Sequence, residues 1–127
     1  MITYKFNKEE GILETTFSGD VSIKDISEYI LTLSKDKTLP GKLKILTDVT
    51  KGKFSEGVIP KDMTILVEAN KKSLAQRDFT YDAFVVSGSF EMALGMLYQK
   101  LNKIKNYKVG IFSTKEAALK WLQDECF

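Results

Sequence analysis

The chain has 127 residues and a net charge of +2 at pH 7. This length predicts one domain with its own core, and the near-balanced charge gives no electrostatic reason to expect a nucleic acid or an anionic membrane as partner. There is no histidine and one cysteine, Cys126, which excludes histidine-based catalysis, the usual zinc sites and an internal disulfide. We therefore expect a cytoplasmic protein, and no integral membrane segment, because no apolar run is long enough to span a bilayer.

The N-terminal part has the pattern of a β-hairpin followed by a helix. Apolar and polar residues alternate over residues 2–7, which predicts a half-buried strand, and a second strand is predicted over residues 12–18. Gly19-Asp20 closes this hairpin. Ser22 then has the position of a helix N-cap, with Asp25 as the acidic partner in a capping box.

The rest of the chain alternates strands with helices. Short aliphatic and β-branched runs predict strands over residues 43–48, 81–86 and 107–112. A long loop is predicted over residues 49–59, and a helix over residues 60–77. Asn70 falls on the apolar stripe of that helix, either at its margin or as a buried polar group that needs a partner.

Two further helices are predicted near the C-terminus. The first follows Ser87-Gly88-Ser89, and the second follows Ser113, which has Glu116 at capping-box spacing. The inner face of the first is expected to contain Phe90, Ala93, Leu94, Leu97 and Leu101.

This order of elements predicts an α/β fold: an N-terminal β-hairpin followed by (βα) units, with a mixed sheet of about five strands. Lys44 and Lys108 lie in the middle of predicted strands. Strands covered by helices on both faces are usually apolar throughout, so we expect helices mainly on one face. The other face would then be partly open to solvent or to a partner.

The closing segment is the most specific part of the sequence. Residues 107–122 contain a strand, a Phe-Ser-Thr step, a Glu-Ala pair and a final Leu-Lys-Trp-Leu. With Gly19, Leu39-Pro40 and Ile45-Leu46-Thr47-Asp48, this segment resembles the SpoIIAA-like family over essentially the whole chain. The resemblance implies a single STAS-like domain over residues 1–127 with a SpoIIAA-like superhelix, a fold shared more distantly with CRAL-TRIO lipid-transfer domains.

The resemblance also implies a kind of partner. STAS domains of anti-sigma-factor antagonists bind a kinase and are switched by phosphorylation of a serine in an Asp-Ser-Ser-Gly-like loop. The segment at that place here, residues 49–55, lacks this motif. Thr50 and Ser55 are the only residues positioned as phospho-acceptors.

Ligands of parallel sheets usually bind beyond the carboxyl ends of the strands. The candidate ligand-binding or partner-binding residues at that edge are Asp48, Thr50, Lys51, Lys53, Phe54, Ser55, Ser87 and Ser113. The serines precede helices, whose N-termini favour an anion. A simpler interpretation is that the serines only cap helices and that Asp48 only caps its own loop. Phe54 and Val58 either form a binding lid or pin the long loop onto the core.

No residues have catalytic or metal-ligand spacing, and no phosphate-binding glycine motif is present. We therefore expect no enzyme activity, no cofactor and no metal. The leading hypothesis is a regulatory module that contacts a protein through residues 49–59, with a kinase or anti-sigma-like regulator as the partner implied by the resemblance. The alternative is a binder of a small apolar ligand or lipid, with a pocket between the sheet and helix 60–77. A homodimer over the open sheet face is a third hypothesis.

Overall fold

The computed structural model describes residues 1–54, 62–74 and 77–124. Their elements, in chain order, are β1 (Ile2–Asn7), β2 (Ile12–Val21), α1 (Ile23–Lys35), β3 (Lys42–Phe54), α2 (Met63–Leu74), β4 (Phe79–Val85), α3 (Ser89–Leu101), β5 (Tyr107–Phe112) and α4 (Lys115–Asp124). The strands form one sheet in the order β1-β2-β3-β4-β5. The β1–β2 pair is antiparallel and all other pairs are parallel, so the predicted mixed sheet with an N-terminal hairpin is confirmed.

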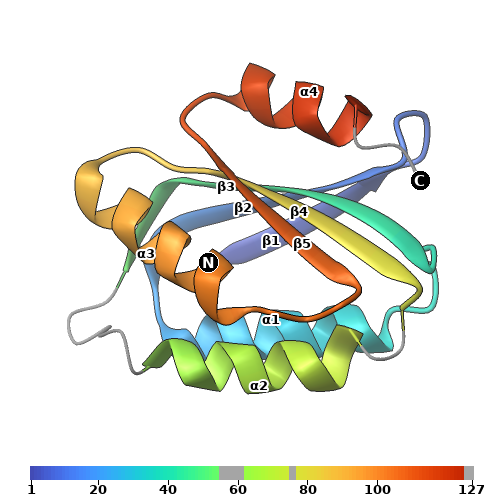
Figure 1. Cartoon of the computed structure of the whole chain (residues 1–127), viewed down its shortest axis with the longest axis horizontal. Coiled ribbons are helices and arrows are strands. Elements are labelled where there is room, and N and C mark those ends of the chain that lie inside the picture. Colours follow the sequence, from blue (N-terminus) through green and yellow to red (C-terminus); the bar gives the residue numbers. More distant parts are fainter. Residues whose placement is uncertain (55–61, 75–76, 125–127) are drawn as a thin grey trace.

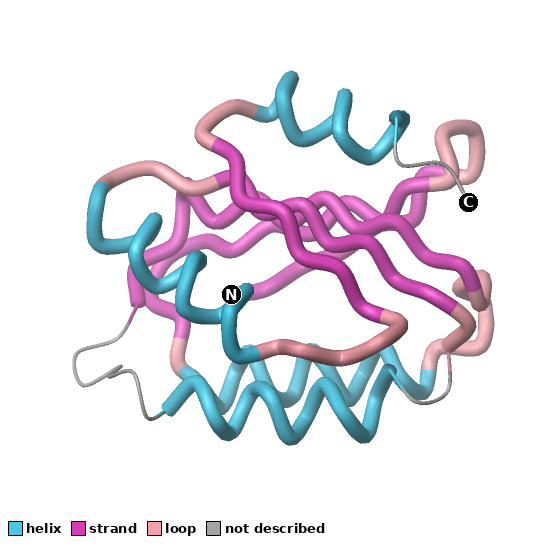
Figure 2. Tube along the Cα trace, viewed as in Figure 1, coloured by secondary structure: helices cyan, strands magenta, loops and turns pink. Residues whose placement is uncertain are grey.

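Helices cover the two faces of the sheet unequally. Figures 1 and 2 show α4 on one side of the sheet and α1 and α2 on the other, and α3 contributes Leu94 and Tyr98 to the same core cluster as α1 and α2. On the opposite face, Ala118 and Leu122 of α4 pack against residues of β3 and β4 such as Leu46. The expectation that helices lie mainly on one face is therefore confirmed.

Strands β2 and β3 run further than the sequence predicted. Beyond Thr16 a bulge shifts the register, and Ser18 to Val21 then pair with Lys51 to Phe54. Residues 49–54 are therefore strand rather than loop, and Gly19-Asp20 lies within β2 rather than closing the hairpin. A Cβ on Gly52 would come within 3.0 Å of the Phe17 Cβ, so the missing side chain permits this close pairing. The polar run Thr50-Lys51-Gly52-Lys53 has no apolar alternation, which explains the error.

The helix caps agree only partly with expectation. Ser22 and Asp25 form the predicted capping box, with both reciprocal hydrogen bonds at 3.0 Å. The cap of α4 is Thr114 rather than Ser113, because the Ala117 N–H donates to Thr114 Oγ1 at 3.2 Å. Ser87 and Ser89 do not cap α3, whose N-cap is Gly88 at a φ of 84°.

The prediction for the inner face of α3 was also partly wrong. Leu94 and Tyr98 are its buried residues, whereas Phe90 is 56% exposed and Leu101 is 38% exposed. Gly95 explains the change, because a Cβ at this position would lie 3.2 Å from Ile111 Cδ1. The helix therefore approaches β5 along the narrow stripe of Leu94, Gly95 and Tyr98.

Candidate functional site: an internal cavity with a buried carboxylate

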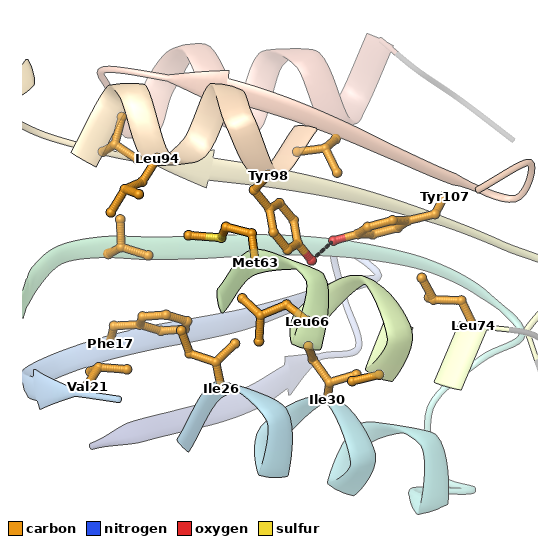
Figure 3. Packing of buried hydrophobic residues seen from close by; sticks show 14 residues of the cluster. Phe17, Val21, Ile26, Ile30, Met63, Leu66, Leu74, Leu94, Tyr98 and Tyr107 are labelled. Atoms are coloured by element: carbon orange, nitrogen blue, oxygen red, sulfur yellow. Dashed lines mark hydrogen bonds between the residues drawn. The ribbon is translucent and has the colours of Figure 1, made fainter. Parts of the chain in front are cut away.

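A cavity of about 80 Å³ lies between the sheet and helices α1, α2 and α3. Its walls are mostly apolar, and Figure 3 shows Phe17, Ile26, Ile30, Met63, Leu66 and Leu94 around this part of the core. Residues of β2, β3, β4 and β5 form the side provided by the sheet. The cavity is therefore located between the sheet and α2, where the ligand-binding alternative requires a pocket.

The alternation of β3 explains how the sheet forms its side of the cavity. Leu43, Ile45, Thr47 and Val49 all line the cavity, as expected for every second residue of a strand. On the helix side, Ser73 is small and buried, and its hydroxyl donates to the Ile30 carbonyl oxygen at 3.1 Å. This bond links α2 to α1 and satisfies a polar group beside an apolar space.

A chain of hydrogen bonds begins at the carboxylate of Asp82 on β4. Thr47 Oγ1 donates to Asp82 Oδ1 at 2.7 Å, and the Tyr107 hydroxyl donates to Asp82 Oδ2 at 2.6 Å. The Tyr98 and Tyr107 hydroxyl oxygens are 2.8 Å apart. Because the Tyr107 proton is directed to Asp82, Tyr98 is the donor in this second bond.

The chain continues into the helices through two asparagines. Asn70 Nδ2 donates to the Tyr98 hydroxyl at 2.7 Å and to Asn102 Oδ1 at 2.8 Å. Asn102 Nδ2 donates to the Tyr98 carbonyl oxygen at 2.7 Å. Asn70 is thus a buried polar residue with partners, which was one of the two outcomes expected for it. We call the six residues Thr47, Asp82, Tyr107, Tyr98, Asn70 and Asn102 the Asp82 chain.

Burial dominates the electrostatics of this chain. Burial raises the pKa of Asp82 to about 6, although the hydrogen bonds from Tyr107 and Thr47 oppose the rise. Burial also raises the pKa of the Tyr98 and Tyr107 hydroxyls, and the nearby Asp82 raises both further. At pH 7 Asp82 is therefore about nine-tenths ionised. Within the described part of the chain no lysine or arginine forms an ion pair with it.

Unlike Asp82, the Thr80 hydroxyl has no hydrogen-bond partner among the described residues. Thr80 lines the cavity and is fully buried, and its hydroxyl makes no hydrogen bond to any described residue. Thr80 lies two residues before Asp82 on β4, so the two side chains emerge on the same face of the sheet. An unsatisfied buried hydroxyl costs about 1–3 kcal/mol, and a polar atom placed in the cavity would remove that cost.

Another polar contact of the cavity wall is structural. The guanidinium of Arg77 donates to the carbonyl oxygens of Leu33 at 2.7 Å and Pro40 at 2.9 Å. Partial burial lowers the pKa of Arg77, and Asp36 opposes this shift. Arg77 thus ties the end of α1 and the following turn to the segment before β4.

The predicted site residues lie where β4 and β5 end, but β3 continues past this level to Phe54. Asp48 is level with Val85 of β4, and Val85 is level with Phe112 of β5, directly before Ser113. Asp48, however, projects to the face opposite the cavity, because its neighbours Thr47 and Val49 line it.

Local hydrogen bonds account for two of the predicted site residues, Asp48 and Thr50. Asp48 Oδ1 accepts from the Thr50 N–H at 2.9 Å and from the Thr50 hydroxyl at 2.6 Å, as the simpler interpretation holds. Thr50, Lys51, Lys53, Ser87 and Ser113 are exposed. Phe54 is half-buried, packs on the core and lines the cavity. Ser55 and Val58 lie outside the described residues. The binding and phospho-acceptor roles of all these residues stay predictions.

The Asp82 chain was missed at the sequence level, apart from Asn70. The available signal was an acidic residue in the middle of a predicted buried strand, between Tyr81 and Ala83. The described residues contain no group of three or more histidine, cysteine, aspartate or glutamate side chains that could hold a metal ion. None of the described helices is both long and apolar enough to cross a membrane.

Comparison with known proteins identifies the fold and no more than the fold. No protein-family model and no curated protein matches the sequence. A solved structure of an uncharacterized protein of the DUF3478 family from Shewanella loihica PV-4, described as having a SpoIIAA-like fold, matches with a TM-score of 0.62. The match covers 96% of this chain and 92% of that chain at 15% sequence identity. The chain therefore has the SpoIIAA-like fold, as the resemblance of residues 107–122 implied.

Proposed function

We propose that this protein is a non-enzymatic binding module that takes a small, mostly apolar molecule into the cavity between the sheet and helices α1, α2 and α3. The observation that carries the proposal is the cavity itself, an apolar space with a few polar groups gathered on β4 and β5. Small-molecule sites commonly have this composition, with polar groups that fix the orientation of an otherwise apolar ligand.

The size of the cavity limits the ligand. Space for one water requires about 10–15 Å³ in the same measure, so 80 Å³ holds roughly five to eight non-hydrogen atoms. The best very small ligands gain about 1.5 kcal/mol per atom. At half that efficiency, a seven-atom ligand would gain about 5 kcal/mol, which corresponds to a Kd of a few tenths of a millimolar.

The test is the binding of 1-hexanol, measured by isothermal titration calorimetry, to three forms of the protein. Leu66 is 2% exposed and lines the cavity, whereas its neighbour Ile65 is 51% exposed on the outer side of α2. Leu66→Trp places a large side chain in the cavity and should abolish binding, while Ile65→Trp should leave binding unchanged. Equal affinity in both variants, or no binding of 10 mM hexanol to the wild type, would contradict the proposal.

A regulatory protein-binding module is the second candidate, supported by large apolar side chains on the helix surface. Phe90 and Met96 of α3 and Ile65 of α2 are each more than half exposed. The partner would be a kinase or anti-sigma-like regulator in the cytoplasm, or a second copy of the chain. Cross-linking in cells should then recover a partner that Phe90→Ser loses. Sedimentation of a clean monomer at high concentration would exclude the homodimer.

A further inference from the structure

We propose that the molecule held in the cavity carries a primary amine, with the Asp82 carboxylate as the partner of its positive charge and the Thr80 hydroxyl as a second hydrogen-bond acceptor. This inference rests on the proposed function, since it names the chemistry of the ligand's polar end. The apolar walls of the cavity would contact the remainder of the ligand.

The first argument is charge. Asp82 is buried in the core, and its two hydrogen bonds come from the neutral hydroxyls of Thr47 and Tyr107. Within the described residues no basic side chain pairs with it. Each carboxylate oxygen can accept a further hydrogen bond. A buried carboxylate is costly without a cation, so a cationic ligand is favoured, whereas a ligand carboxylate or phosphate would be repelled.

The second argument is the unpartnered hydroxyl of Thr80. Thr80 and Asp82 share one face of β4, and both line the cavity. Tyr107 is level with Thr80 in the sheet and reaches Asp82 with its hydroxyl. An ammonium group has three donors and no acceptor. It would therefore donate to both Asp82 and Thr80 Oγ1. An alcohol could also pair with both groups, by donating to Asp82 and accepting from the Thr80 O–H. Thr80 therefore indicates a polar end beside Asp82, and the charge of Asp82 selects the amine.

The other titratable groups of the cavity wall do not replace Asp82 in this role. They are Tyr29 from α1, Arg77 before β4, Glu91 and Tyr98 from α3, and Tyr107 from β5. Burial raises the pKa of all three tyrosines, so they stay neutral near pH 7. Arg77 is bonded to backbone carbonyl oxygens. Glu91 is half-buried in the first turn of α3, and it serves as the control.

The experiment compares three ligands with the same six-carbon tail: hexylamine, 1-hexanol and hexanoate. Their affinities are measured by titration calorimetry at pH 7.5. The wild type should bind hexylamine at least about tenfold more tightly than hexanol, and hexanoate most weakly. Asp82→Asn should remove the preference for the amine and retain hexanol binding, whereas Glu91→Gln should retain the preference. Thr80→Val should weaken the binding of both hexylamine and hexanol several-fold and retain the preference for the amine.

A pH series on the wild type tests the same claim without any variant. Hexylamine stays protonated from pH 5 to pH 7.5, like the lysine ammonium. Asp82, with a pKa of about 6, is about one-tenth ionised at pH 5. Hexylamine binding should therefore weaken about tenfold between pH 7.5 and pH 5, while hexanol binding stays constant.

The outcomes separate the two proposals. Hexanol binding without a preference for the amine would overturn this inference and leave the proposed function standing. A preference that persists in Asp82→Asn, or that is constant with pH, would also overturn it. Failure of all three ligands to bind would overturn the proposed function as well.

Discussion

Replacing Asp82 by asparagine should stabilise the protein at neutral pH. The folded-state pKa of Asp82 is about 6, against an ordinary value of 3.8. At 1.36 kcal/mol per pKa unit this difference corresponds to about 3 kcal/mol. Because the folded state holds the proton more tightly, the free energy of unfolding falls as the pH rises from about 4 to 6. Above pH 6 the full cost is present, and Asp82→Asn removes it.

The hydrogen bonds of the Asp82 chain do not reduce this gain, because the pKa of about 6 already includes those from Tyr107 and Thr47. An asparagine at position 82 would still accept from Thr47, and its amide would donate to Tyr107, as the hydroxyl of the neutral carboxyl does. The gain at pH 7.5 is therefore about 3 kcal/mol. At pH 4 folded Asp82 is already neutral, and the gain should nearly vanish.

The assay is urea denaturation of the wild type and Asp82→Asn at pH 4, 5, 6 and 7.5, followed by Trp121 fluorescence. Glu9→Gln, on the exposed hairpin turn, is the control for removal of a surface charge and should shift stability by less than about 0.5 kcal/mol. If Asp82→Asn is less stable than the wild type at pH 7.5, or if their difference does not change with pH, then Asp82 is not a buried charge.

Two further predictions concern the packing of α4 on the sheet and the start of α1. Gly110→Ala should destabilise the protein by about 1–3 kcal/mol, because its Cβ would lie 2.7 Å from Phe112 and 3.3 Å from Trp121. Urea denaturation measures the loss, and unchanged stability would contradict the close packing of Phe112 and Trp121 over Gly110. Ser22→Ala removes one half of the capping box with Asp25 and should cost about 1 kcal/mol, measured by thermal unfolding; a loss below about 0.3 kcal/mol would contradict the cap.

The sequence predicted the sheet and the identity of its elements because these depend on local patterns. Alternation marked β1, and the capping box of Ser22 marked the start of α1. The extension of β3 to Phe54 was missed because it depends on pairing with residues 18–21 across a bulge. The polar sequence of residues 50–53 gives no indication of that pairing.

The candidate site was harder to predict, since it depends on tertiary packing. The residues of the Asp82 chain come from β3, β4, β5, α2 and α3, together with Asn102 directly after α3. Only the packing of these elements brings them together. The rule that ligands bind beyond the carboxyl ends of the strands predicted Asp48 as a site residue. Asp48, however, projects away from the cavity. Asn70 was the one member whose sequence position, a polar residue on an apolar stripe, indicated a buried partner.

The most direct test of the ligand-binding account is the location of bound hexylamine by nuclear Overhauser contacts to methyl groups. The account predicts contacts with Ile45, Val49 and Leu66, which line the cavity. Contacts confined to the exposed side chains of Ile65 and Met96 would place the ligand on the surface and contradict the account.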